Sequence, residues 1–390
     1  MNPTLFWIAA GCSAMALGAL AFHGLCLLGA MSFRRQVKPA FDLAATPLPV
    51  SILKPLRGAD PEMYESFRSH CVQDYPHPYE LLFGVNDGGD EALAYVQRLQ
   101  AEFPQLAIRV IVCSHVIGMN RKVSNLAQML TEAKYEHVVI NDSDIRVPVD
   151  YLRRVMAWFS GASDAKPTGM VTCMYRALAG KTVWSKVESL GVTMDFMPPV
   201  LAARFLEGRV YFGLGSTMAV SKAAVAAMGG LESIADHLAD DYELGTRIAD
   251  AGFNVVLSDV VVETFVADYD CTQFFDHQLR WARTVRSSRP SGYFGVVITF
   301  GVFWSVLAVL FSGCAPWSIG LLAANVLARL LVLQVVGVSI IGHGTAWKLI
   351  WLMPLREFFA PLIWLLSLGG ERIVWRGEVF RLRRGKLEKV

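Results

Sequence analysis

The sequence predicts an α/β domain with a mostly parallel sheet, flanked by segments that are apolar enough to lie in a membrane. From residue 50 to residue 140, short apolar runs alternate with helical stretches of about a dozen residues, as in sheets with right-handed crossovers. The composition is the second observation. With 54% hydrophobic residues, 18% charged residues and a mean hydropathy of +0.39, the 390-residue chain is too apolar for an ordinary soluble protein.

The first element is an apolar stretch from Leu5 to Phe33. Residues 1–33 contain no Lys or Arg, and Arg34 and Arg35 follow at once. The stretch is long enough to cross a hydrocarbon core about 30 Å thick. A cleavable signal would carry its positive charge before a shorter apolar run. We therefore predict a retained membrane anchor over residues 1–33, with the polar middle of the chain in the cytosol.

Residues 45–290 predict the α/β domain itself, with a Rossmann-like first half. Apolar runs predict strands at Val50–Arg57 (with its loop), Leu81–Val85, Ile108–Val112 and Val138–Ile140, and helices cover about 90–101 and 120–133. No G-x-G-x-x-G follows the first strand, which argues against an NAD or FAD fold. Residues 151–264 are less regular. Within them, Val210–Val220 has three small residues in an apolar strand pattern, which marks either close approach of a ligand or backbone, or only a bulge.

Two carboxylates, Asp142 and Asp144, follow the strand at 138–140 with Ser143 between them. Open α/β sheets bind their ligands at the carboxyl ends of the strands. Carboxylates at this spacing can share one hard cation, and a diphosphate supplies the remaining oxygens that Mg²⁺ or Mn²⁺ prefers. A nucleotide-sugar is such a ligand. The alternative is an Asx-turn that only ends the strand.

Asp87 and Lys122 are two further candidates at the same predicted edge. Asp87 follows the second strand, where it could contact a base or ribose, or only form a turn ahead of Gly88 and Gly89. Lys122 lies near the start of a helix, where the helix dipole disfavours a cation unless an anion is close. A phosphate would explain it. The alternative is a solvated lysine on an amphipathic helix.

A second acidic pair, Asp240 and Asp241, precedes a helical stretch. Asp240 is a plausible N-cap, and Glu243 three residues later would complete a capping box. Asp241 would then lie in the first turn, where the dipole favours its ionised form. An ionised carboxylate beside a ligand can accept a proton from a hydroxyl. The alternative is that both acids only complement the helix N-terminus.

The stretch from Thr272 to Arg286 predicts an amphipathic helix with three arginines on one face. Arg280, Arg283 and Arg286 are spaced by three residues. Such a face could bind a diphosphate, or it could be a cationic cluster next to the membrane. We expect both, with Arg280 turned to the site and the later two turned to lipid headgroups.

Residues 291–370 predict C-terminal membrane segments. Tyr293–Ala315 and Trp317–Ile341 predict a transmembrane hairpin, in which Arg329 should face protein, a polar cavity or a headgroup. The third apolar stretch, 347–368, is interrupted by two prolines and by Arg356 and Glu357. We expect it to be interfacial or re-entrant, with that Arg and Glu paired.

Residues 371–390 predict a basic cytosolic tail, because seven Lys and Arg residues lie between positions 372 and 389. The net charge of the whole chain is only +2, and its basic residues cluster beside apolar segments. This distribution indicates the anionic face of a lipid bilayer as a partner and not nucleic acid. The seven cysteines are scattered without a C-x-x-C pair, which favours reduced packing residues.

The order of motifs is more specific than any one of them. Val85-Asn-Asp87, Asp142-Ser-Asp144, Asp240-Asp241-Tyr242 and Arg280-Trp281 follow one membrane anchor and precede further membrane segments. In this the chain resembles the ceramide glucosyltransferase-like family of inverting GT-A glycosyltransferases, strongly over about residues 45–290 and in layout elsewhere. One departure is visible in His277-Gln-Leu-Arg-Trp281, because the family motif (Q/R)-x-x-R-W places Gln or Arg where this chain has His277.

The resemblance implies a GT-A fold and a role for each motif. Asp87 would lie near the uridine, Asp142 and Asp144 would hold a divalent metal, and Asp241 would be the catalytic base. Arg280, with Lys122, would neutralise the UDP leaving group, and Trp281 would form an apolar wall. His277 would hydrogen-bond a phosphate, or Gln278 would replace it.

The implied activity is transfer of a hexose from a UDP-sugar, UDP-glucose first, to the hydroxyl of a membrane lipid, with ceramide as the acceptor. The segment resembles bacterial members of the family, including hopanoid-associated transferases, so transfer of N-acetylglucosamine to a hopanoid polyol is the nearest alternative. A processive polysaccharide synthase is a further alternative, but it needs a wider bundle of membrane helices. A catalytically silent protein that only binds its ligand is a third, and the presence of every expected acidic residue argues against it.

Overall fold

A computed structural model describes residues 3–36, 48–60, 62–160, 166–375 and 377–389. The chain forms two compact units, each discontinuous in sequence. The helical unit consists of Met1–Gln36, Ala179–Gly208 and Asp268–Arg384, and the sheet unit consists of Val37–Leu178, Arg209–Ala267 and Gly385–Val390. The sequence-based boundaries near residues 45, 290 and 370 divide the chain at single points, and they stay a prediction.

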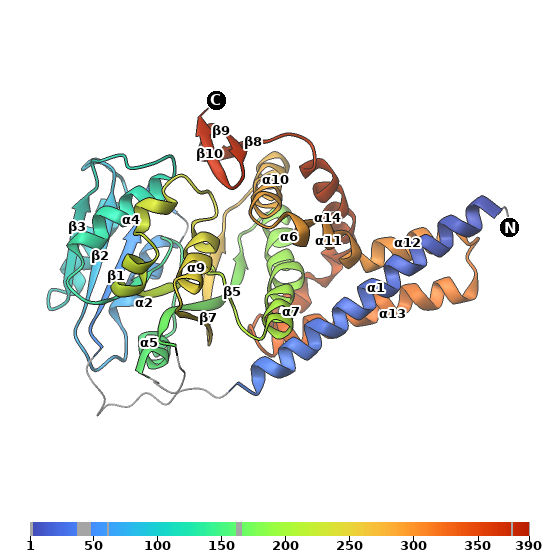
Figure 1. The fold of residues 1–390 in the computed structure, drawn as a ribbon, viewed down its shortest axis with the longest axis horizontal. Coiled ribbons are helices and arrows are strands. Elements are labelled where there is room, and N and C mark those ends of the chain that lie inside the picture. Colours follow the sequence, from blue (N-terminus) through green and yellow to red (C-terminus); the bar gives the residue numbers. More distant parts are fainter. Residues whose placement is uncertain (1–2, 37–47, 61, 161–165, 376, 390) are drawn as a thin grey trace. The chain divides into compact units, whose positions relative to one another are not determined.

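The sheet unit is built on seven strands in the order β3-β2-β1-β4-β6-β5-β7. Figure 1 labels β3, β2, β1, β5 and β7 of this sheet. The strands are β1 (Val50–Pro55), β2 (Tyr79–Val85), β3 (Ala107–Val112), β4 (His137–Ile140), β5 (Thr168–Ala179), β6 (Met218–Ser221) and β7 (Asn254–Val266). Strands β1 to β4 pair in parallel, whereas β6 runs antiparallel to both β4 and β5. The predicted parallel, Rossmann-like first half is therefore confirmed.

The central strands are continuous apolar runs, as expected of a sheet that is covered on both faces. All six residues of β1 are buried. The helices of this unit are α2 (Met63–Cys71), α3 (Leu93–Glu102), α4 (Arg121–Glu132), α5 (Tyr151–Ser160), α8 (Lys222–Ala227), η2 (Leu231–Ile234) and α9 (Asp240–Asp250), and the last element is β10 (Lys386–Lys389). The buried ring of Phe67 on α2 packs on Phe83 of β2, with ring centroids 4.7 Å apart. This contact joins the helix layer to the sheet.

Parallel pairing fixes where the candidate site residues lie. Strands β2 and β4 flank β1 on opposite sides and run in the same direction, so both end at one edge of the sheet. Asp87 follows β2 and Asp142 follows β4. Two strand spacings separate these ends by about 10 Å.

The predicted strand over 210–220 is shorter than expected, because only its last residues belong to β6. The preceding loop approaches another backbone closely. A Cβ on Gly213 would lie 2.8 Å from the carbonyl oxygen of Asp241, and the Gly213 N–H donates to that oxygen at 3.1 Å. Of the two alternatives for these small residues, close approach is the one observed.

The helical unit contains the apolar segments. Its elements are α1 (Pro3–Arg34), α6 (Val183–Gly191), η1 (Val192–Phe196), α7 (Met197–Glu207), α10 (Cys271–Ser288), α11 (Pro290–Gly295), η3 (Val296–Thr299), α12 (Gly301–Phe311), α13 (Pro316–Val332), η4 (Leu333–Val338), η5 (Gly344–Leu352), α14 (Met353–Ser367), β8 (Arg372–Trp375) and β9 (Glu378–Arg383). Strands β8 and β9 form an antiparallel pair, so the predicted basic tail is folded.

In the described part of the chain, three helical segments are long and apolar enough to cross a membrane: Pro3–Arg34, Pro316–Val338 and Gly344–Ser367. The pair Pro290–Thr299 and Gly301–Phe311 would make a fourth, but it is bent by 49° at its junction. The sequence predicts an interruption in residues 347–368, whereas in the structure the bend lies near residue 300. The number of crossings stays a prediction.

Arg329 faces protein, which is one of the three environments predicted for this charge within an apolar helix. Its guanidinium contacts the Asp195 carboxylate at 2.6 Å and donates to the Glu357 carboxylate at 2.7 Å, and only 8% of its side chain is exposed. The predicted pairing of Arg356 with Glu357 is wrong. Arg356 donates to Asp195 at 2.5 Å, because adjacent residues on a helix point in different directions.

Arg329→Met is expected to destabilise the protein by about 3–5 kcal/mol, because it leaves Glu357 as a buried and unpaired carboxylate. The thermal unfolding midpoint in detergent measures this loss. Lys348→Met, at an exposed position of η5, is the control. The double variant Arg329→Met with Glu357→Gln should recover part of the loss. A midpoint equal to that of the control would contradict the assigned role of the ion pair.

Candidate active site

Asp142 and Asp144 lie in the turn that follows β4, as predicted. The Asp142 side chain is 40% exposed, whereas the Asp144 carboxylate accepts a hydrogen bond from the Thr264 hydroxyl of β7. Burial and the negative charge of Asp142 raise the pKa of Asp144 to about 6. Two carboxylates that repel each other in this way favour a cation between them.

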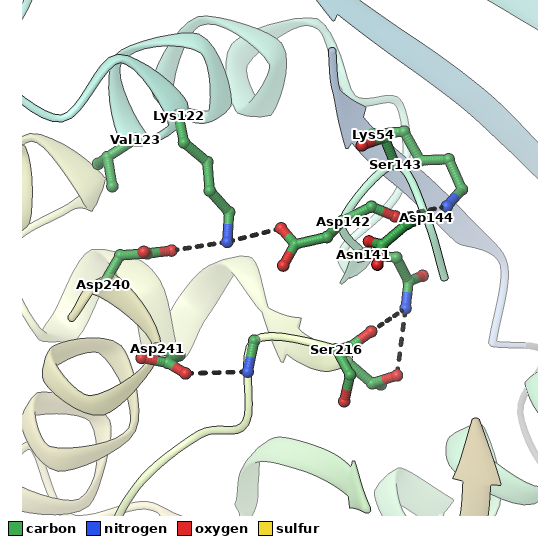
Figure 2. A network of polar contacts seen from close by, with 12 residues as sticks. Lys54, Lys122, Val123, Asn141, Asp142, Ser143, Asp144, Ser216, Asp240 and Asp241 are labelled. Carbon is green, nitrogen blue, oxygen red and sulfur yellow. Dashed lines mark hydrogen bonds and ion pairs between the residues drawn. The ribbon is translucent and has the colours of Figure 1, made fainter. Parts of the chain in front are cut away.

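Lys122 connects the two acidic pairs. Its Nζ lies 2.8 Å from Asp142 Oδ1 and 3.0 Å from Asp240 Oδ2 (Figure 2). Burial alone would lower the pKa of Lys122, but these two carboxylates outweigh it and raise the pKa above its ordinary value. The anion that a lysine requires at a helix N-terminus is therefore supplied here by carboxylates of the protein.

The predicted capping box at α9 is wrong. The N-cap is Ala239, and no side chain caps the helix start. Asp240 contacts Lys122 instead, and Glu243 accepts a hydrogen bond from Arg247 at 3.1 Å. The carboxylates of Asp240 and Glu243 therefore form ion pairs and do not cap the helix N-terminus.

Asp241 lies in the first turn of α9, as predicted. Its carboxylate accepts hydrogen bonds from the backbone N–H of Gly215 at 3.0 Å and of Tyr242 at 2.8 Å. Burial, with the neighbouring Asp240 charge, raises the pKa of Asp241 to about 6. The group can therefore exchange a proton near neutral pH.

Gly215 shows that the two acidic pairs share one space. A Cβ at this position would lie 3.4 Å from Asp241 Oδ2 and 3.6 Å from Asp142 Oδ2. Both oxygens thus border the small volume that the absent side chain leaves open. Four residues predicted from sequence, Asp142, Asp144, Asp241 and Lys122, meet in one part of the sheet unit, and their roles stay proposals.

Lys54 is a site residue that the sequence analysis missed. It is fully buried on β1, and its Nζ donates to the backbone carbonyl of Asp142 at 3.0 Å (Figure 2). Burial lowers the pKa of Lys54 to about 7, against the raising effect of Asp144 and Asp142. The sequence does hold an indication, because a lysine within the apolar run of a buried parallel strand is rare unless it is paired.

Asn141 directly precedes the turn that contains Asp142 and Asp144, the acidic turn, and holds it in place. It is fully buried, and its Nδ2 donates to the Ser216 carbonyl at 2.7 Å and to the Thr217 hydroxyl at 3.1 Å. These bonds fasten the turn after β4 to the loop that contains Gly215. The carboxylates are therefore held by a satisfied buried network.

Asp87 lies on the exposed loop after β2, at the edge described above. Its Oδ1 accepts a hydrogen bond from the Gly89 N–H at 2.7 Å, which is the turn that the sequence analysis kept as an alternative. This bond leaves the second carboxylate oxygen for another donor.

His277, Arg280 and Trp281 lie on α10 in the helical unit. His277 Nδ1 contacts the Glu188 carboxylate at 3.1 Å, and its ring centroid is 5.1 Å from that of Trp281. Gln278, the suggested substitute for His277, is buried and accepts from Arg356 at 2.9 Å. Both side chains already have partners within this unit.

Arg283 and Arg286, which are expected to turn toward lipid headgroups, donate to backbone carbonyls of the helical unit. Arg283 donates to the Gly369 carbonyl at 2.9 Å, and Arg286 donates to the Gly370 carbonyl at 2.8 Å. These carbonyls follow the C-terminus of α14, where arginines commonly bind unpaired backbone oxygens. The two guanidinium groups therefore tie α10 to the end of α14.

The acidic turn fits a divalent cation whose remaining ligands are phosphate oxygens of the substrate. In the described ranges, no group of three or more Asp, Glu, His or Cys residues forms a complete metal site. Mg²⁺ and Mn²⁺ do not require one, since one or two carboxylates plus phosphate oxygens suffice. The oxygen-only donors of Asp142 and Asp144, and the raised pKa of Asp144, match such a cation.

A family model and several known proteins match the chain. The sequence profile of glycosyl transferase family 21 matches residues 11–388. Ceramide glucosyltransferase 3 of Caenorhabditis elegans is 26% identical, over 86% of this chain and 73% of the relative. Beta-monoglucosyldiacylglycerol synthase of Synechocystis sp. is 24% identical, over 62% of this chain and 49% of the relative.

A solved structure confirms the predicted GT-A fold. Mannosyltransferase PcManGT from Pyrobaculum calidifontis, in complex with GDP-Man and Mn²⁺, superposes with a TM-score of 0.51 at 20% identity. The superposition covers 92% of this chain and 99% of that chain. At this level of identity the likeness shows the fold.

Proposed function

The chain belongs to glycosyl transferase family 21, and from this premise we propose that it transfers glucose from UDP-glucose to the primary hydroxyl of a ceramide-type membrane lipid. One observation carries the proposal. The oxygens of Asp142 and Asp241 border one space over Gly215, so a donor held at the first carboxylate places its sugar beside the second. That is the arrangement a single displacement requires.

Each candidate residue has a proposed task in this reaction. Asp142 and Asp144 would hold a divalent cation, which when bound would supply positive charge to the diphosphate. Lys122 adds a second positive charge, which stabilises the leaving UDP. Asp87, about 10 Å away along the sheet edge, contacts the nucleoside. Arg280 and His277 bind the diphosphate, and Trp281 forms an apolar wall for the sugar or the acceptor.

Asp241 is the proposed base. It accepts the proton of the acceptor hydroxyl while that oxygen attacks the anomeric carbon. The bond between this carbon and the diphosphate oxygen breaks, and UDP leaves with the electron pair. Because attack and departure occur on opposite faces of the sugar, the anomeric configuration inverts.

The acceptor is proposed from the relatives and from the apolar helices. The C. elegans relative is named for ceramide, and the Synechocystis relative is named for diacylglycerol. Both lipids present a primary hydroxyl on a two-chain body, so diacylglycerol is the second candidate. The three apolar segments would hold the enzyme at the inner membrane of a bacterium, with the sheet unit in the cytosol.

A substrate panel tests this proposal. The purified chain with Mn²⁺ is incubated with UDP-glucose or UDP-N-acetylglucosamine and with vesicles that contain ceramide, diacylglycerol or a hopanoid polyol, and products are identified by mass spectrometry. Glucosylceramide is the expected product. A glucosyl diacylglycerol would support the second candidate, and an N-acetylglucosaminyl hopanoid would favour the alternative raised from the sequence. A ladder of long polymers, or no product, would overturn the proposal.

The rate of transfer is expected to fall as the pH falls through about 6. Asp241 has a raised pKa near 6, and below it the carboxyl is protonated and cannot accept the acceptor proton. Transfer should drop about tenfold for each further pH unit. The measurement is kcat between pH 4.5 and pH 8 at saturating Mn²⁺ and donor, so that protonation of Asp144 does not limit binding. A rate that stays flat down to about pH 4.5 would contradict the assignment of the base.

A further inference from the structure

The backbone just before α9 is held from one side by the segment that precedes Lys122. Asn120 is the N-cap of α4, and its side-chain Nδ2 donates a hydrogen bond to the His237 carbonyl at 2.8 Å. The Asn120 N–H donates to the Ala235 carbonyl at 2.8 Å, and the Met119 N–H donates to Asp236 Oδ1 at 3.0 Å. The start of the lysine helix is thus fastened to the backbone that leads to Asp240 and Asp241.

Strand β10 holds the same backbone from another side. The Leu238 N–H donates to the Gly385 carbonyl at 3.1 Å, and the Leu387 N–H donates to the Asp236 carbonyl at 2.7 Å. His237 and Lys386 form an antiparallel bridge between these bonds. Leu387 is only 3% exposed, so its side chain is buried as well.

Side chains extend this contact into α9. The His237 ring lies 3.4 Å from the Glu243 carboxylate and 3.3 Å from the Arg247 guanidinium. Gly385 has φ +81°, and a Cβ there would lie 3.5 Å from His237 Nδ1. Glycine is favoured here because its left-handed backbone turns the chain toward the His237 loop.

We propose that strand β10 is a positioning element of the transfer site: by pairing with Asp236–Leu238 it fixes the first turn of α9 and so the place of Asp241. The inference rests on the proposed function. Only Ala239 separates residues 236–238 from the acidic pair, and without β10 and the preceding Gly385 the Leu238 N–H and the Asp236 carbonyl lose these partners. A displacement of about 1 Å at the base is enough to cost about 100-fold in rate.

The test is a chain that ends at Arg384, compared with the full chain in the same detergent. We expect kcat to fall about 100-fold while the KM for UDP-glucose changes little, because the donor carboxylates are held by β4 and Asn141. The peptide Gly-Lys-Leu-Glu-Lys-Val, added at millimolar concentration, should restore part of the rate. The same peptide with Leu387→Asp should not, because it cannot bury the aspartate.

Point variants in the full chain separate positioning from general stability. Leu387→Asp should lower kcat, whereas Glu388→Gln, at an exposed position of the same strand, should not. Backbone amide exchange gives a readout that does not require activity: exchange at 236–243 should rise in the shortened chain while that of β1 and β4 stays unchanged.

Two results would overturn the inference. One is a shortened chain with the full kcat and unchanged amide exchange, which leaves the proposed function standing. The other is amide exchange that rises equally over the whole sheet unit, which would make β10 a general fold element. If the full chain transfers no sugar, the proposed function fails, and the exchange experiment still decides whether β10 fixes α9.

Discussion

Asp241→Asn is expected to reduce transfer by about 10²–10⁴-fold while UDP-glucose binding stays nearly unchanged. The substitution keeps the shape of the side chain and an oxygen for the Gly215 N–H, but the amide cannot accept the acceptor proton. The measurements are kcat with ceramide vesicles and the Kd of UDP-glucose with Mn²⁺ by calorimetry. Comparable activity in the variant would reject Asp241 as the base.

The same variant has a second expected effect, on stability. Burial raises the pKa of Asp241 from 3.8 to about 6, so the folded state favours the protonated carboxyl and loses stability as the pH rises through about 6. Asn has no charge to bury. The unfolding midpoint of the variant should therefore exceed that of the parent at pH 8, and the difference should shrink as the pH falls from about 6 toward 3.8. Asp250→Asn, at the exposed end of α9, is the control and should change neither rate nor midpoint.

Asp144→Ala is expected to weaken metal-dependent donor binding by at least about 100-fold. It removes one of the two carboxylates that fit the cation and leaves Asp142 paired with Lys122. The measurement is a Mn²⁺ titration of UDP-glucose binding. Asp74→Ala, which removes a surface carboxylate of the same unit, is the control. An unchanged Mn²⁺ titration would show that the cation binds elsewhere.

The hydrophobic pattern of the sequence predicted those parts of the fold that depend on neighbouring residues in the chain. The apolar runs correctly predicted strands β1 to β4, because a parallel strand that is covered on both faces of the sheet is apolar along most of its length. The position of Asp142 after β4 then followed from the strand itself. Parallel pairing also predicted that Asp87 would lie at the same sheet edge.

Errors arose where distant residues compete for a side chain. Asp240 satisfies the capping rule in sequence, but Lys122 contacts its carboxylate from another helix. Arg356 and Glu357 are neighbours in the chain, yet each pairs across the helical unit, with Asp195 and Arg329. No sequence window contains these partners.

The missed residues have the same origin. In the sequence, Lys54 only interrupts an apolar strand. Its partner becomes visible in the fold, where the Asp142 carbonyl after β4 lies 3.0 Å from its Nζ. The pairing of β10 with Asp236–Leu238 joins positions about 150 residues apart, and the sequence analysis described that region only as a basic tail. Contacts of this kind depend on the completed fold.

The most direct test of the account is the location of the metal. Anomalous diffraction at the manganese edge, from crystals of the full chain with Mn²⁺ and UDP, should show one cation in bonding contact with the carboxylates of Asp142 and Asp144, with Asp241 facing the same space. A cation bound away from both aspartates, or an Asp241 carboxylate turned out of that space, would contradict the central claim.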